Sequence, residues 1–451
     1  MKRISIFIKD IFSIKYIYVY LTKKEKFLIY SLLLILFISS IAELVGIASI
    51  IPLLAIIKDP INIDNYLVKK YLEFIFNITG IQRVNIAIIS SILVVIFAYS
   101  ARLFSQFYIY YTSAQIGIFL HNRALKNYLS LPYDKQIGKI TNDLPHCLTK
   151  GLTDVTQRII FRWLNAISSF ILFLFLSGGL FWAEPRITVF FIISTFLYYL
   201  ILNVPVIKFV SQRSKRMHSF SKDHLKSLSN LKWFIKQLKL YGVEDKYFHK
   251  IAQSNRRFRE LNILNSFYTT FPRTLLELLL IIIIIAIISF NPQKDLGNFN
   301  PRILFCFIVL QKLLPLFTSL YVSFKDLIEK KYALKDLLIY LKIPNIKSNI
   351  NIDFSRKDIS KIEIKNVSFG YPFQQKFVLS GISLSIEINK YYLLTAPSGY
   401  GKSTLIDLML GLQIPNKGKI FYKGNNLNKN ASEIITGQFM AYVPQVNYFN
   451  D

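Results

Sequence analysis

Eight residues near the C-terminal end of the chain have the types and the spacing of a phosphate-binding loop. Residues 397–404 read Pro-Ser-Gly-Tyr-Gly-Lys-Ser-Thr, with apolar residues 391–396 before them and a largely apolar stretch through Leu412 after them. We predict a strand that breaks into a glycine-containing turn and reopens as a helix. The backbone N–H groups of such a turn, together with the positive end of the helix, bind phosphate oxygens.

The side chains of this loop fit a nucleoside triphosphate and its magnesium ion. Ser398 opens the loop, and Gly399 and Gly401 keep the anion site free of side chains. Lys402 can reach the β- and γ-phosphates as a point charge, and the Ser403 hydroxyl can bind the Mg²⁺ that bridges them. We therefore expect ATP and Mg²⁺ as ligands.

Two further positions of the loop leave alternatives open. Thr404 supplies a second hydroxyl that can contact the nucleotide. Ala396 stands where the phosphate-loop pattern has glycine, and alanine fits there if its φ is negative but not if it is positive. The alternative to a nucleotide site is a chance Gly-x-Gly-Lys-Ser in an ordinary strand–turn–helix. The apolar stretches on both sides, which predict the strand and the helix of a phosphate loop, favour the nucleotide site.

The composition excludes an ordinary soluble protein. Of the 451 residues, 53% are hydrophobic, and the mean hydropathy is +0.38, so much of the chain belongs in a lipid bilayer. The net charge of +29 comes without a basic stripe interleaved with stacking aromatics outside the apolar segments, and we expect no nucleic-acid partner. Cys147 and Cys306 are too few and too far apart for a disulfide framework or a metal site.

Six apolar segments are long enough to cross a membrane as helices. They occupy residues 27–57, 85–111, 159–182, 186–210, 272–290 and 302–324. Residues 1–26 mix basic and apolar residues at helical intervals, which predicts an amphipathic helix on the inner membrane surface. A signal peptide is the alternative, but no small-residue cleavage site follows. Residues 64–76 predict a short helix at the outer interface.

The loops between these spans alternate in length and charge. Residues 112–158 and 211–271 are long and carry most of the loop cations, which places both loops and both termini in the cytoplasm, at the inner (plasma) membrane. Helical periodicity continues through them, so we expect the spans to project as helical hairpins. Residues 131–140 and 228–239 are their most basic and amphipathic parts.

The pattern changes after the sixth span. Residues 325–342 predict a charged helix, and residues 343–357 form a linker rich in Asn, Ser, Lys and Pro. Residues 361–367 and 378–388 alternate with period two and predict strands. We therefore divide the chain into an interfacial helix (1–26), a helical membrane domain (27–342), the linker (343–357) and the first part of an α/β domain (358–451).

Together these features resemble a bacterial ABC exporter half-transporter over essentially the whole chain. The α/β segment opens with Val-Ser-Phe-Gly-Tyr-Pro at 367–372, where Tyr371 matches the aromatic that stacks on adenine in this family; the alternative is a tyrosine that merely ends a strand. Gln445, in Ala-Tyr-Val-Pro-Gln at 441–445, matches the family's Q-loop glutamine, which approaches the magnesium ion. The resemblance implies six transmembrane helices in the type I exporter fold, joined to the N-terminal part of an α/β P-loop domain.

The family mechanism that this resemblance implies requires two copies. In a homodimer, each ATP would lie between one chain's phosphate loop and the partner's signature segment. ATP binding would pull the cytoplasmic hairpins together and turn the cavity outward, and hydrolysis would reset it. The coupling between ATP and the membrane domain is predicted to run through short helices at the loop tips, residues 131–140 and 228–239.

Within the exporters, the membrane half resembles the lipid-linked oligosaccharide flippases. The likeness rests on residues 41–46, 66–76, 272–277 and 311–315. A pyrophosphate-linked lipid needs cations in an otherwise apolar cavity. The alternative is that each cation reaches a headgroup or pairs with a local carboxylate. The candidate cavity residues are Glu43, Arg102, Arg273, Glu277 and Lys312.

Beyond Gln445 we find no signature motif, Walker B strand or switch histidine, and we assign no catalytic residue. We expect residues 1–451 alone not to hydrolyse ATP. The absence of these motifs is interpreted as a truncation, which a frameshift, a contig end or a split gene would each explain. Two alternatives to a glycan-lipid flippase stay open. One is a non-catalytic remnant or membrane scaffold, and the other is an exporter of peptide or lipid A.

Overall fold

The computed structural model describes residues 13–50, 83–131, 133, 144–290, 301–344, 361–371, 376–387, 389–422, 425–426 and 441–443. It contains a helical unit, residues 1–122 and 145–339, and a second unit, residues 123–144 and 340–451, which holds a small sheet. Several predictions lie outside the described residues: the outer helix at 64–76, most of the loop tip at 131–140, most of the linker, and Gln445.

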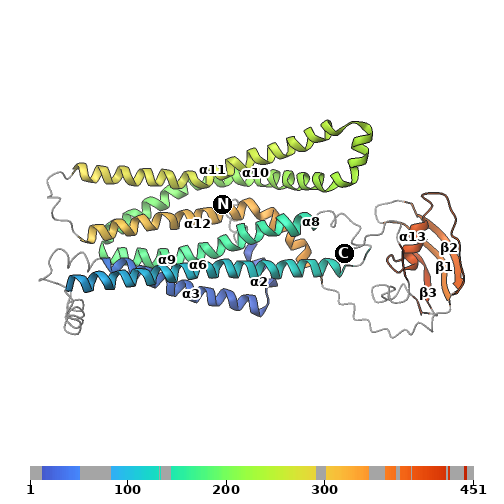
Figure 1. Cartoon of the computed structure of the whole chain (residues 1–451), viewed down its shortest axis with the longest axis horizontal. Coiled ribbons are helices and arrows are strands. Elements are labelled where there is room, and N and C mark those ends of the chain that lie inside the picture. Colours follow the sequence, from blue (N-terminus) through green and yellow to red (C-terminus); the bar gives the residue numbers. More distant parts are fainter. Residues whose placement is uncertain are drawn as a thin grey trace. The chain divides into compact units, whose positions relative to one another are not determined.

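Six long helices of the described chain correspond to the six predicted spans (Figure 1). They confirm these segments as helical over the described residues; residues 51–57 of the first span lie outside them. The six helices are α3 (Lys23–Ala48), α6 (Arg83–Leu129), α9 (Phe161–Ala183), α10 (Pro185–Tyr241), α11 (Glu244–Phe290) and α12 (Pro301–Lys342). Among the described residues, three stretches are long and apolar enough to cross a membrane by length and composition: Lys23–Ala48, Asn85–Leu129 and Asp154–Trp182. The predicted charged helix at 325–342 is the continuation of α12.

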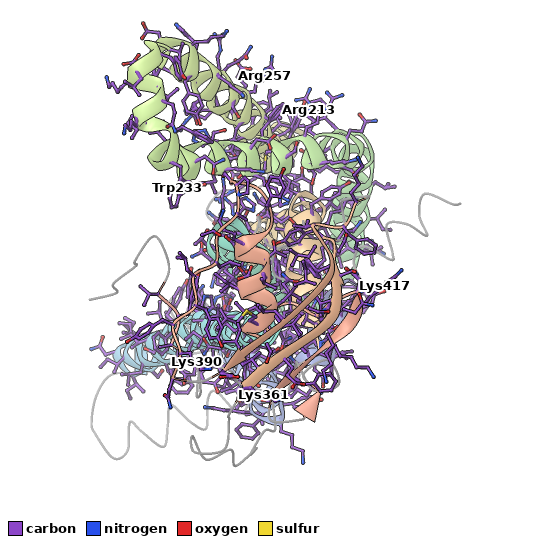
Figure 2. The ribbon with its side chains drawn as sticks, turned by 90° about the vertical axis from the view of Figure 1, so that its right-hand side faces the viewer. Arg213, Trp233, Arg257, Lys361, Lys390 and Lys417 are labelled. Carbon is purple, nitrogen blue, oxygen red and sulfur yellow. The ribbon has the colours of Figure 1, made fainter. Side chains whose placement is uncertain are left out.

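The long loop between the fourth and fifth spans is a helical hairpin, as predicted. Helix α10 has 57 residues and is therefore about 85 Å long, well beyond the roughly 30 Å hydrocarbon core of a bilayer. It ends at Gly242, whose φ of 61° is left-handed, and α11 packs back along it (Figure 1). Trp233, near the turn, is exposed (Figure 2).

The N-terminal segment contains two helices rather than one within the described residues. Helix α2 (Ser13–Tyr20) ends before Thr22, which has an extended backbone and begins α3. The Thr22 backbone N–H donates to Glu25 Oε2 at 3.0 Å, and this capping box fixes the start of α3. Ile17 of α2 is buried, whereas the apolar side chains of Tyr16 and Val19 are exposed.

The segment that leads into α9 is π-helical in two places. Helix α8 (Leu144–His146) is followed by η2 (Cys147–Gly151) and η3 (Asp154–Ile160), which continues into α9. A π-turn holds one residue more than an α-turn, and such turns are frequent at functional sites. The core of this unit packs α9 against α12 and α3 through Leu172, Leu176, Val309, Leu313 and Ile47.

The second unit has a four-stranded antiparallel sheet in the order β2-β1-β3-β4. The strands are β1 (Lys361–Phe369), β2 (Leu379–Glu387), β3 (Lys417–Tyr422) and β4 (Asn425–Asn426). Both predicted strands are present as β1 and β2. Helix α13 (Lys402–Met409) covers the sheet because Leu405 and Leu408 pack on Val367, Phe369 and Ile420.

The strand predicted at residues 391–396 is not formed. None of the four described strands pairs with this stretch, which has no regular secondary structure. Its apolar side chains stay in solvent, and Leu393 is 89% exposed. A strand exists only where a neighbour accepts its backbone hydrogen bonds, so apolar composition alone is not enough to make one.

Candidate nucleotide site and intramembrane charge cluster

The phosphate loop has the backbone that its glycines predict. Gly399 and Gly401 have φ values of 86° and 85°, a left-handed conformation that favours glycine. A Cβ on Gly401 would lie 2.9 Å from Leu379 and 3.0 Å from Val378, whereas one on Gly399 would meet nothing within 4 Å. Glycine is therefore required at position 401 for two reasons: the positive φ and the lack of room for a Cβ.

Ala396 is accommodated without backbone strain. Among the described residues, the non-glycine positions with positive φ are Asn366 and Asn389. The backbone at Ala396 therefore lies in the region that alanine adopts freely. Alanine at this position therefore does not have to adopt a left-handed backbone.

Lys402 is the first residue of α13, directly after Gly401. Its ammonium group donates to the carbonyl oxygens of Ala396 and Pro397, the second at 3.0 Å. The cation thus lies folded over the loop, next to the N-terminus of a helix, where backbone N–H groups attract anions. Ser398 and Ser403 are exposed, so the Ser403 hydroxyl is free to reach a metal ion.

The structure brings Tyr371 to this loop from the end of β1. Its hydroxyl lies 3.2 Å from Thr404 Oγ1, and its ring meets Phe369 edge-on at a centroid distance of 5.1 Å. The preceding backbone is fixed because Gly370 N donates to Asn416 Oδ1 at 2.7 Å. Sequence reasoning missed Asn416, whose only signal is an asparagine just before β3.

Three of the five predicted cavity residues meet in the helical unit. Arg102 of α6 donates to Glu43 Oε2 at 2.5 Å, and Lys312 of α12 donates to Glu43 Oε1 at 2.9 Å. The Lys312 ammonium also lies 4.8 Å from the centre of the Tyr99 ring. The Glu43 side chain is only 10% exposed. Each carboxylate oxygen holds one cation, and the cluster keeps one net positive charge.

The other two predicted residues pair with each other instead. Arg273 Nε donates to Glu277 Oε1 at 2.7 Å along α11, and their side chains are 58% and 46% exposed. This pair carries no net charge and buries little. The structure therefore separates a charged cluster of Glu43, Arg102 and Lys312 from a neutral pair that the sequence had placed in the same group.

A second charge cluster, which sequence reasoning missed, surrounds Asp326 of α12. Its side chain is fully buried, with Arg158, Arg162 and Lys325 nitrogens 3.5 to 3.6 Å from its oxygens. Arg158 is part of the π-helical η3. A buried carboxylate needs such neighbours, so these contacts tie the start of α9 to α12.

A histidine pair lines a small cavity next to these π-turns. The rings of His146 and His218 meet edge-on with centroids 5.5 Å apart, and His218 Nε2 lies 2.9 Å from Asp336 Oδ2. Burial, with help from His218 and Lys150, lowers the pKa of His146 to about 4. Burial alone would raise the pKa of Asp336, but the hydrogen bond and charge of His218 outweigh it and lower that pKa. His146 is therefore neutral at neutral pH.

Comparisons with known proteins agree with this geometry. Residues 379–451 match the family model described as ABC transporter. The chain is 24% identical over 316 residues to "Multidrug resistance-like ATP-binding protein MdlB" of Buchnera aphidicola subsp. Schizaphis graminum, over 68% of this chain and 51% of that protein. It is 34% identical over 96 residues to "ATP-dependent lipid A-core flippase" of Photorhabdus laumondii subsp. laumondii, over 21% of this chain and 16% of that protein.

The fold is similar to that of a solved bacterial Atm1-family ABC exporter with ATP bound. The TM-score is 0.59 at 14% identity, over 89% of this chain and 68% of the other. The matched residues span 51% of the MdlB-like relative and 16% of the lipid A-core flippase. It thus has the fold of an ABC exporter half-transporter, a multi-pass helical membrane domain joined to the N-terminal part of an ABC transporter domain.

Proposed function

We propose that this chain binds ATP with Mg²⁺ at residues 398–404 and forms part of an ATP-driven exporter. The observation that carries the proposal is the loop with left-handed Gly399 and Gly401 and with Lys402 at the start of α13. The loop lies within the segment that matches the ABC transporter family model. Lys402 would hold the β- and γ-phosphates, and Ser403 and Gln445 would approach the Mg²⁺.

Nucleotide affinity of the purified chain in detergent micelles tests this proposal. Lys402→Ala removes a charge-assisted contact to phosphate, and we expect about 10- to 100-fold weaker ATP binding. Lys376→Ala, an exposed lysine in the same unit, is the matched control and should bind ATP as the unaltered chain does. Equal ATP affinity in the Lys402→Ala variant and the unaltered chain would overturn the proposal.

For the substrate we propose an anionic lipid, in particular a pyrophosphate-linked oligosaccharide lipid or related glycolipid. The support is the net positive charge of the Glu43, Arg102 and Lys312 cluster in an apolar helical unit. Glu43 would keep the two cations in place in the absence of substrate, and a phosphate group could then bind the side of the cluster that Glu43 does not occupy. Arg273 and Glu277, which neutralise each other, would contribute less.

Transport by the protein as it occurs in the cell tests the substrate class. After reconstitution into liposomes, we expect Arg102→Ala and Lys312→Ala to reduce flipping of a pyrophosphate-linked glycolipid at least about 10-fold, the effect of losing a charged hydrogen bond. Unchanged flipping would remove the pyrophosphate hypothesis. The lipid A-core flippase among the relatives supports a lipid A exporter as the rival, and a peptide exporter stays the other alternative. Transport of lipid A and of peptide is measured in parallel.

The same proposal includes a homodimer in the lipid bilayer with both termini in the cytoplasm. Its support is the excess of basic residues in the two long loops and the general pairing of such half-transporters. Cross-linking of the protein in native membranes, and protease access to each terminus in sealed vesicles, test these two points separately.

A further inference from the structure

Pro272 interrupts the backbone hydrogen bonds of α11. It lies inside this helix, which runs from Glu244 to Phe290. In an α-helix the N–H of each residue donates to the carbonyl oxygen four positions earlier, and proline has no N–H. The carbonyl oxygen of Tyr268 therefore receives no hydrogen bond from position 272. This missing bond is called the Pro272 gap below.

A side chain of α12 supplies the missing donor. The hydroxyl of Tyr321 donates to the Tyr268 carbonyl oxygen at 2.7 Å, and Tyr321 is only 4% exposed. A buried carbonyl group without a partner costs free energy comparable to a lost hydrogen bond, so this contact offsets the Pro272 gap. A hydrogen bond that would lie within α11 is thereby replaced by one between α11 and α12.

The same face of α12 carries a second donor to α11. Lys325, four positions after Tyr321 and so its neighbour on the helix surface, donates to the Asn265 carbonyl oxygen at 3.1 Å. Position 269 is threonine, whose N–H is the usual helical donor to Asn265. Of these two donors from α12, Tyr321 is therefore the one that replaces a helical hydrogen bond.

A tyrosine of α10 contacts the proline itself. The hydroxyl of Tyr198 donates to the Pro272 carbonyl oxygen at 2.9 Å. Position 276 is leucine, whose N–H is the usual donor to this carbonyl, so Tyr198 adds a hydrogen bond and replaces none. Tyr198, Tyr268 and Tyr321 all pack with Leu276 in one apolar cluster. The two tyrosine hydroxyls thus share their surroundings but differ in what they do for α11.

The Pro272 gap lies at the end of two predicted spans. The predicted fifth span begins at residue 272, and the predicted sixth ends at residue 324, just after Tyr321. Deep in lipid a carbonyl group without a partner is costly, whereas at the membrane surface water can take the place of a protein donor. The hydrogen bond from Tyr321 can therefore open here, and α11 has no hydrogen bond of its own across the gap.

We propose that Tyr321 is a releasable latch on a hinge of α11 at Pro272. While the latch is closed, the Tyr321 hydroxyl holds the part of α11 before Pro272 against α12. When it opens, water binds the Tyr268 carbonyl oxygen, and this part of α11 can turn relative to α12. The hinge is a property of the membrane helices and does not depend on the proposed ATP site.

Hydrogen–deuterium exchange of the full chain in detergent, measured by mass spectrometry on peptides that cover residues 264–271, tests the latch. Tyr321→Phe keeps the ring and removes the hydroxyl. We expect exchange in these peptides to become about 5- to 30-fold faster, the factor that corresponds to a buried carbonyl group losing its partner. Pro272→Ala restores the backbone N–H, and in that background Tyr321→Phe should accelerate exchange at most about twofold.

Tyr198→Phe is the matched control, because it removes a hydroxyl from a carbonyl group that has its usual helical donor. Its effect on exchange should agree within about twofold with and without Pro272→Ala. If Pro272→Ala does not fold, Pro272→Val restores the same N–H in a larger side chain and takes its place in the experiment.

Three results would overturn the latch. If Tyr321→Phe accelerates exchange equally with and without Pro272→Ala, its hydroxyl does not serve the Pro272 gap. If Tyr321→Phe leaves exchange in residues 264–271 unchanged, the contact holds nothing in place. If it accelerates exchange equally in the α9 core at residues 172–180, the variant is destabilised as a whole and no local hinge has been released.

Discussion

The intramembrane cluster and the phosphate loop handle their cations in opposite ways. Arg102 and Lys312 converge on Glu43, whose side chain is nearly buried. Lys402, in an exposed loop, contacts backbone carbonyl oxygens of its own loop. A charge in an apolar setting needs a counter-ion at all times, because desolvation is costly. A lysine that stays in contact with water needs no counter-ion before its ligand binds. The cations of the first site are thus paired with a carboxylate, whereas the cation of the second site contacts only neutral carbonyl groups.

The largest effect should follow from removing the carboxylate that pairs with both cations of the cluster. Glu43→Gln leaves Arg102 and Lys312 without a counter-ion, and we expect a loss of about 3–5 kcal/mol of unfolding free energy. Denaturant unfolding of the chain in detergent measures it. Glu277→Gln breaks the exposed pair with Arg273 and should cost only about 0.2–0.5 kcal/mol. Similar losses of unfolding free energy in the two variants would contradict the prediction that the nearly buried carboxylate stabilises the fold more than the exposed one.

A smaller effect should come from pH, through the buried His146. Its pKa of about 4 in the folded chain lies below the usual value of about 6.5. Between these values the unfolded chain binds more protons, so stability is complete above about pH 6.5 and falls as the pH drops toward 4. Because Asp336 lies nearby and the site can relax, we expect a loss of about 1–2 kcal/mol across this window.

Melting curves of the detergent-solubilised chain between pH 7.5 and 4.5 check this pH dependence. His146→Gln cannot take up the proton and should flatten the decline. His249→Gln, at an exposed histidine, should leave the decline as it is. Groups that face His146 from neighbouring elements, namely His218, Lys222, Lys150 and Asp336, are unchanged in both variants. An equal decline in both would show that another group is responsible.

An effect smaller than those of Glu43 and His146 is expected at Ala396, where the loop departs from the phosphate-loop pattern. Because its φ is not left-handed, Ala396→Gly relieves no strain and only increases the freedom of the unfolded chain. We expect a loss of about 0.4–1 kcal/mol in stability and an ATP affinity within about twofold of the unaltered chain. A tenfold gain in ATP affinity would mean that alanine restricts the open loop after all.

The sequence predicted the helices far better than the contacts between them. Long apolar segments identify α3, α6, α9 and their successors because nothing but a helix satisfies its own backbone in lipid. Strand formation at 391–396 could not be predicted in this way, since a strand depends on a partner elsewhere in the chain. The turn of the phosphate loop and the helix after it were predictable because the residues that form them are neighbours in the sequence.

Charge pairing between residues far apart in the sequence could not be predicted, for the same reason. Glu43 and Lys312 are 269 positions apart, and no periodicity connects them. Arg273 and Glu277, four positions apart on a helix, form the pair that sequence can foresee. The clusters around Asp326 and His146 likewise depend on how η2, η3, α10 and α12 pack.

The π-helical turns have a consequence for the lengths that this segment tolerates. If Asp154–Ile160 lost one residue, the α-helical hydrogen-bond pattern could run on without interruption, and such a deletion need not unfold the helix. It would, however, turn everything before it by about 100° relative to α9. Lys150 and Cys147 would leave their present neighbours while Arg162 kept its own. The segment should therefore accept changes of residue type more readily than changes of residue number.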